Sequence, residues 1–90
     1  MDRFLKLNNG TILSDSQAYD DGKGLNIIIG DKSLDVLQTV LLLSKKENTQ
    51  KIIYHYYKAE LAFEGYTKLV SVRDEGTMIT VTLKKEDSDE

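Results

Sequence analysis

The apolar residues of this chain recur in short runs that are separated by polar, glycine-containing turns. Asn9-Gly10 follows the alternating segment at residues 4–8, and the turn at residues 73–76 precedes the alternating segment at residues 78–83. Asn-Gly is a pair that tolerates the positive φ angles of a two-residue hairpin turn. Alternation with a period of two places every second side chain on one face of a strand. The pattern therefore predicts a sheet with short, hairpin-like connections.

One segment departs from this strand pattern. Its apolar residues have the spacing of one face of an α-helix: Leu34, Leu37, Val40 and Leu41. Ser33 is positioned to cap the N-terminus, while Lys45 and Lys46 place positive charge at the C-terminal end. We therefore expect a helix that begins at Leu34 and lays this apolar stripe on the sheet.

The strands before the helix are expected at residues 4–8, 11–14 and 25–29, with a polar turn at residues 15–24. After the helix and a loop at residues 47–50 we expect three more strands, at residues 51–57, 59–72 and 78–83, the second with a bulge at Gly65. This predicts an α+β fold, one helix packed on a mostly antiparallel sheet in the order β-β-β-α-β-β-β. Residues 1–85 would form a single domain, and residues 86–90 a frayed acidic tail.

Side chains that do chemistry near neutral pH are scarce. The chain has one histidine, His55, and no cysteine. A cysteine–histidine pair and a tetrahedral soft-metal site are therefore unavailable, and no Gly-x-Ser-x-Gly motif is present. Four aspartates lack the spacing of a calcium loop: Asp15, Asp20, Asp21 and Asp31. We expect no catalytic residue, no cofactor and no metal, and thus no enzyme.

Charge and hydropathy narrow the range of partners. Fifteen acidic and twelve basic residues give a net charge of −3, which argues against a dedicated nucleic-acid-binding protein. The apolar run at residues 40–43 is far shorter than the roughly 20 residues of a membrane span. Residues 1–7 alternate between polar and apolar and lack the apolar core of a signal peptide. We expect neither a membrane nor a nucleic-acid partner.

Tyrosines are the best candidate for a functional surface. The candidate interface residues are Tyr54, Tyr56, Tyr57, Tyr66 and Lys68. The tyrosines fall on two strands that we expect to be neighbours, and tyrosine is enriched at protein interfaces because it combines a large contact area with a polar tip. Ordinary sheet packing and stacking of single-stranded nucleic acid are the alternatives, the second disfavoured by the acidic net charge. Unpaired sheet edges offer a second route to association, strand to strand.

Four segments stand out beside these patterns: LKLNNGT at residues 5–11, ENTQKI at 47–52, FEGYTKL at 63–69 with Val72 after it, and TVTL at 80–83. Together they resemble small phage and prophage proteins of Gram-positive bacteria. The resemblance implies a short α+β domain encoded among virion and tail genes. It supplies no catalytic residue.

From this resemblance we expect a phage-derived structural or accessory protein that acts through protein–protein contacts, for example in a tail or baseplate. Its partner would be a virion protein, a host protein or a second copy of the chain. Its location would be the host cytoplasm or the virion. The alternative is an inhibitor of a host defence or nucleic-acid-handling protein, in which the acidic turn at Asp20-Asp21 and the acidic tail mimic phosphates.

Overall fold

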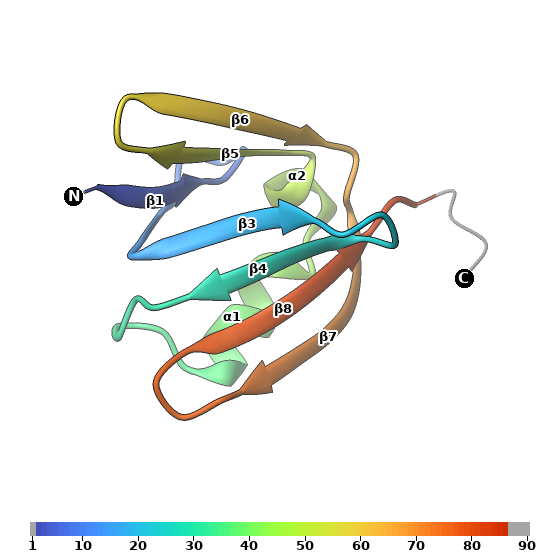
Figure 1. The fold of residues 1–90 in the computed structure, drawn as a ribbon. Coiled ribbons are helices and arrows are strands. Elements are labelled where there is room, and N and C mark those ends of the chain that lie inside the picture. The colour runs from blue at the N-terminus through green and yellow to red at the C-terminus, as the bar shows by residue number, and fades with distance from the viewer. Residues whose placement is uncertain (1, 87–90) are drawn as a thin grey trace.

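The computed structural model describes residues 2–86, which contain eight strands and two short helices (Figure 1). The strands are β1 (Arg3–Lys6), β2 (Ile12–Ser14), β3 (Ser16–Asp20), β4 (Leu25–Ile29), β5 (Lys51–Tyr56), β6 (Ala59–Glu64), β7 (Lys68–Asp74) and β8 (Ile79–Lys84). The helices are α1 (Val36–Leu43) and α2 (Lys46–Thr49). No helix in the described range is long and apolar enough to cross a membrane.

The strands form two antiparallel sheets rather than one. The first sheet has the order β2-β1-β5-β6 and the second has the order β3-β4-β8-β7. Each sheet consists of two hairpins that pair side by side. Both helices lie between β4 and β5 in the chain, where α1 contacts β7 and α2 contacts β5 (Figure 1). The predicted fold of one helix on one sheet, in the order β-β-β-α-β-β-β, is therefore wrong.

Two segments account for this correction. Residues 59–72, expected as one bulged strand, are divided at Gly65 into β6 and β7, which belong to different sheets. Gly65 has a φ of 85°, a left-handed conformation that glycine adopts readily, and its N–H donates to the Gln50 carbonyl at 3.0 Å. The other segment is β3, which lies inside the region expected to be a polar turn.

The chain also changes sheets between β2 and β3, at Asp15. This residue has a φ of 50°, and its carbonyl accepts a hydrogen bond from the Gly30 N–H at 3.0 Å. A Cβ atom on Gly30 would lie 2.6 Å from the same carbonyl oxygen. Glycine at position 30 therefore allows the close approach that holds this corner.

One buried cluster joins the two sheets and α1. Its apolar members are Leu5, Leu7, Leu13, Ala18, Leu25, Ile27, Ile29, Leu43, Ile52, Tyr54, Ile79, Val81 and Leu83. The alternation predicted for residues 79–83 is confirmed, since Ile79, Val81 and Leu83 are buried and the residues between them are half-buried. Burial of this cluster is the main favourable contribution to folding.

The helix has a different register from the predicted one. Asp35, not Ser33, is the N-cap, and its carboxylate accepts a hydrogen bond from the Gln38 N–H at 2.8 Å. The buried residues are Thr39 and Leu43, whereas two members of the predicted stripe are exposed: Leu37 at 66% and Leu41 at 57%. Thr39 can be buried because its hydroxyl donates to the Asp35 carbonyl at 2.8 Å.

Residues 47–49, expected as part of a loop, belong with Lys46 to the short helix α2. The Asn48 side chain, which is buried, donates to the Leu42 carbonyl at 2.8 Å. This hydrogen bond satisfies a carbonyl near the end of α1, where helix carbonyls lack an intrahelical partner. The predicted loop therefore carries a polar anchor between the two helices.

Candidate functional site

Two of the predicted interface tyrosines face the interior side of the first sheet. Tyr54 pairs with the buried Leu5 of β1 and is itself only 9% exposed. The Tyr54 and Tyr56 rings stack on each other with their centroids 4.9 Å apart. Tyr54 is therefore a core residue, and Tyr56, which is half-buried, packs against the core.

Tyr57 and Tyr66 lie beyond opposite ends of β6. Tyr57 occupies the β5–β6 turn with a φ of 56°, is 68% exposed, and has the Arg3 guanidinium 5.5 Å from its ring centroid. Tyr66 follows Gly65 and packs edge-on against Phe63. Lys68 is an exposed residue at the start of β7. The five predicted residues are thus distributed over several places and do not share one face.

The Tyr66 hydroxyl donates a hydrogen bond to the Asp20 carboxylate at the β3–β4 turn. This bond is the main reason why the pKa of Asp20 is lowered and the pKa of Tyr66 is raised. The Lys85 ammonium lies 5.3 Å from the Tyr66 ring centroid. Tyr66 therefore attaches the β6–β7 connection to the second sheet.

The acidic turn uses its carboxylates locally. Asp21 Oδ1 accepts hydrogen bonds from the N–H groups of Lys23 at 2.8 Å and Gly24 at 3.0 Å, and Asp21 Oδ2 accepts one from the Asn26 amide at 2.9 Å. These bonds, first that from the Lys23 N–H, lower the pKa of Asp21. The turn residues thus hold the β3–β4 hairpin in shape.

Part of the predicted acidic tail is likewise engaged within the fold. The Glu86 carboxylate lies 3.3 Å from the Lys46 ammonium and accepts a hydrogen bond from the Thr67 hydroxyl at 3.1 Å. The ammonium of Lys46 and the hydroxyl of Thr67 lower the pKa of Glu86. Residues 87–90 of the predicted tail lie outside the described residues.

His55 lies on the outer face of the first sheet. Its ring stacks on Phe4, with centroids 4.4 Å apart and planes 9° apart, and its Nε2 lies 3.9 Å from a Glu60 carboxylate oxygen. No group of three or more His, Cys, Asp or Glu residues within residues 2–86 is arranged to hold a metal ion. The contacts of His55 are those of a packed side chain on a sheet face.

Each sheet ends in two edge strands, and three of the four are short, covered or irregular. β2 has only three residues, and β3 contacts β1 of the other sheet. β7 carries an irregularity between Leu69 and Ser71. Such devices limit strand-to-strand association in native proteins.

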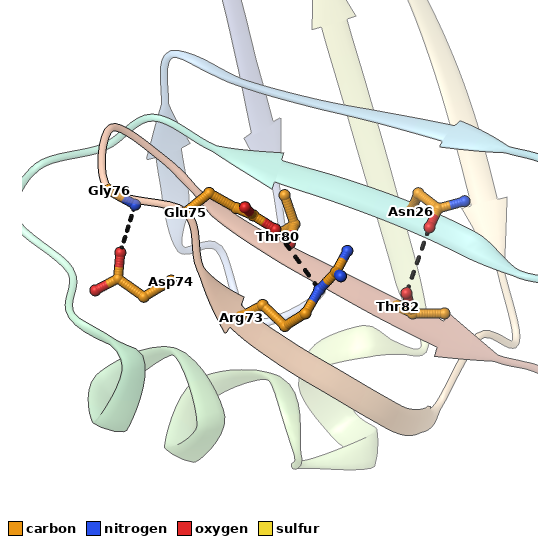
Figure 2. A network of polar contacts seen from close by, with 7 residues as sticks. All are labelled: Asn26, Arg73, Asp74, Glu75, Gly76, Thr80 and Thr82. Atoms are coloured by element: carbon orange, nitrogen blue, oxygen red, sulfur yellow. Dashed lines mark hydrogen bonds and ion pairs between the residues drawn. The ribbon is translucent and has the colours of Figure 1, made fainter.

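Polar contacts hold the turn next to this irregular strand (Figure 2). Asp74 accepts a hydrogen bond from the Gly76 N–H at 2.8 Å, and the Arg73 Nε lies 3.7 Å from a Glu75 carboxylate oxygen. These charged residues at the end of β7 add to its protection.

The fourth edge strand, β6, is regular and uncovered. It pairs with β5 at six consecutive positions without a bulge. All of its residues are exposed except Phe63, which is half-buried, and Leu61 in its middle is 48% exposed. Exposed edges of this kind are templates for pairing with another strand.

The backbone groups that β6 presents outward follow from two hydrogen bonds. The Tyr57 N–H donates to the Asp2 carbonyl at 2.8 Å. The odd-numbered residues of β5 therefore bond toward β1, and the even-numbered residues bond toward β6. The Gly65 N–H donates to Gln50, so the odd-numbered residues of β6 bond toward β5. The N–H and C=O groups of Glu60, Ala62 and Glu64 therefore face away from the sheet. We take this free edge of β6 as the candidate functional site.

Comparisons with protein-family models, with curated proteins and with solved structures found no match for this chain. The resemblance to phage and prophage proteins therefore stays a prediction. The proposal for its function is therefore based on the geometry of the free edge of β6.

Proposed function

We propose that this chain is a non-enzymatic protein-interaction module whose β6 edge accepts an extended strand of a protein partner. The observation that carries this proposal is the row of outward-facing backbone groups at Glu60, Ala62 and Glu64 on a regular strand. In strand addition, main-chain hydrogen bonds supply affinity, and alternate side chains supply specificity.

The side chains of β6 define what such a strand needs. On the interior side of the sheet, Leu61 is half-exposed and Phe63 half-buried, so an added strand with apolar residues there would cover both. On the outer side, Glu60 and Glu64 favour a basic residue in the added strand. A suitable partner strand is thus apolar on one face and places a basic residue opposite at least one of these glutamates on the other.

A structural or accessory role in a phage particle is the biological setting that we infer for this module from the sequence resemblance. The inhibitor alternative depends on the acidic turn and tail. The carboxylates of Asp20 and Asp21 are already engaged in hydrogen bonds within the fold, and no described contact favours a basic partner there. We therefore do not propose it as a second function.

The test is selection of short peptides from a displayed random library against the wild-type chain. Ala62→Pro removes an outward N–H, while Ala62→Ser keeps it, so the two variants form a matched pair. We expect edge-binding peptides to lose roughly tenfold or more in affinity for Ala62→Pro and to retain it for Ala62→Ser, since a lost hydrogen bond and the steric bulk of the ring together exceed about 1.4 kcal/mol. Peptides that bind both variants equally would overturn the proposal.

A further inference from the structure

We propose that the strand which β6 accepts is β6 of a second copy, paired antiparallel about a two-fold axis at Leu61. The two first sheets would then join into one continuous sheet across the dimer. This inference rests on the proposed function of β6 as a docking edge, and it specifies the partner and the register.

Backbone geometry limits the registers that two β6 strands can adopt. Only the even-numbered residues present outward N–H and C=O groups, so even-numbered residues must lie opposite even-numbered residues of the second copy. A two-fold axis at any residue of β6 satisfies this condition, and the axes at Leu61 and Ala62, its two central residues, pair the most of the strand. Axes between two residues do not, because they place outward groups opposite groups that already bond to β5.

Charge selects one of these two registers. An axis at Ala62 places Glu60 opposite Glu64 twice. An axis at Leu61 instead places Glu64 opposite Lys58 of the second copy twice, and Glu60 opposite Ala62. Opposite charges in directly facing positions stabilise a strand pair, and like charges destabilise it.

The charges that this register joins are free in the monomer. Neither the Lys58 ammonium nor the Glu64 carboxylate forms an ion pair with any other side chain in residues 2–86. The two Glu60 residues lie diagonally across the axis and not directly opposite each other. The register therefore gives two unpaired charges a partner and leaves no carboxylate directly facing another.

The same register also covers apolar surface. On the interior side of the sheet it places Leu61, which is 48% exposed, opposite Leu61 of the second copy, and Ala59 opposite Phe63. A pairing confined to one edge strand buries less than the roughly 1,200–2,000 Å² of a standard stable interface. The dimer is therefore weak, and its population depends on protein concentration.

The experiment measures the dimer dissociation constant by sedimentation over a concentration series. We expect Lys58→Glu and Glu64→Lys each to weaken the dimer about tenfold, because two attractive pairs become two repulsive ones. The double variant restores the attraction with reversed signs and should return the constant to near its wild-type value. Lys23→Glu, Glu47→Lys and their combination change the same charges away from β6 and should leave it unchanged.

Ala62→Pro and Ala62→Ser add a test that does not depend on charge, with the first abolishing the dimer and the second retaining it. A wild-type chain that stays monomeric at all concentrations would overturn the inference, as would a double charge variant no tighter than the single ones. A monomer that still binds selected peptides in a way that Ala62→Pro abolishes would overturn self-pairing and leave the proposed function standing. Loss of both would overturn both.

Discussion

The strands on either side of Gly65 are both edge strands, but they differ in how open they are to another chain. β7 is interrupted between Leu69 and Ser71, and α1 contacts it. β6 is regular over six paired positions, and almost all of it is exposed. One continuous stretch of chain thus supplies a protected edge to one sheet and an open edge to the other.

This difference shows that the openness of an edge strand to another chain depends more on its regularity and its neighbours than on its composition. Both strands contain apolar and polar residues, and both carry charges. An irregularity breaks the even row of backbone groups that a second strand needs, and β6 has none. We place the proposed binding function at β6 because its edge is open to a further strand.

The strongest test of an open β6 edge is a pair of proline variants one residue apart. Leu61→Pro removes an N–H that bonds to β5, and we expect it to lower the free energy of unfolding by about 3 kcal/mol. Ala62→Pro removes an N–H that faces outward, and the expected loss is below about 1 kcal/mol. Urea unfolding of both variants at a concentration where the chain is monomeric measures the difference.

Equal destabilisation by the two prolines would contradict the assignment of the Leu61 N–H to a bond with β5 and of the Ala62 N–H to the outer edge. Leu61→Ser and Ala62→Ser control for the loss of the side chains, since both keep the N–H groups. The difference in unfolding free energy between the two proline variants should exceed the difference between the two serine variants.

The sequence patterns predicted those features of the fold that depend only on neighbouring residues in the chain. The alternation at residues 79–83 reports directly which side chains face the core, and the structure confirms it. The register of α1 was predicted wrongly because the sequence pattern places the apolar Leu37, and not the polar Thr39, on the buried face. The hydroxyl of Thr39 finds its partner within the helix, so its polarity does not prevent burial.

Strand order and sheet membership were out of reach because they depend on distant pairing. The phase change at Gly65 is compatible with a bulge within one strand and equally with a passage between two sheets. β3 was missed because its sequence, SQAYD, has little apolar character, although Ser16 and Ala18 are buried. Association through a sheet edge was predicted, but the strand that forms the open edge was out of reach for the same reason, since it is defined only once the order of the strands is known.

The second test compares the two corners at which the chain changes sheets. Gly30→Ala would place a Cβ atom 2.6 Å from the Asp15 carbonyl oxygen, so we expect a loss of about 2 kcal/mol from overpacking. Gly65→Ala meets no atom within 4 Å, and its expected loss of about 1 kcal/mol comes from the positive φ alone. Thermal unfolding ranks the two. A larger loss for Gly65→Ala would contradict the closer packing of the β2–β3 corner around Gly30.

The smallest expected effect concerns the contact that anchors the chain after β6, from the Tyr66 hydroxyl to the Asp20 carboxylate. The pKa of Asp20 is lowered in the folded state, mainly by this bond, so its contribution to stability is present above the ordinary value of 3.8 and is lost as the pH falls below it. The pKa of Tyr66 is raised by the same bond, so its contribution is present below 10.0 and is lost as the pH rises through the folded-state value.

Tyr66→Phe removes the hydroxyl and keeps the ring, so it should flatten the dependence of unfolding free energy on pH at both ends. Tyr19→Phe is the matched control, because Tyr19 is an exposed tyrosine on β3. Urea unfolding across the acidic and alkaline ranges compares the two variants with the wild type. If Tyr66→Phe and Tyr19→Phe gave the same pH profile, the hydroxyl of Tyr66 would not anchor the β6–β7 connection to the second sheet.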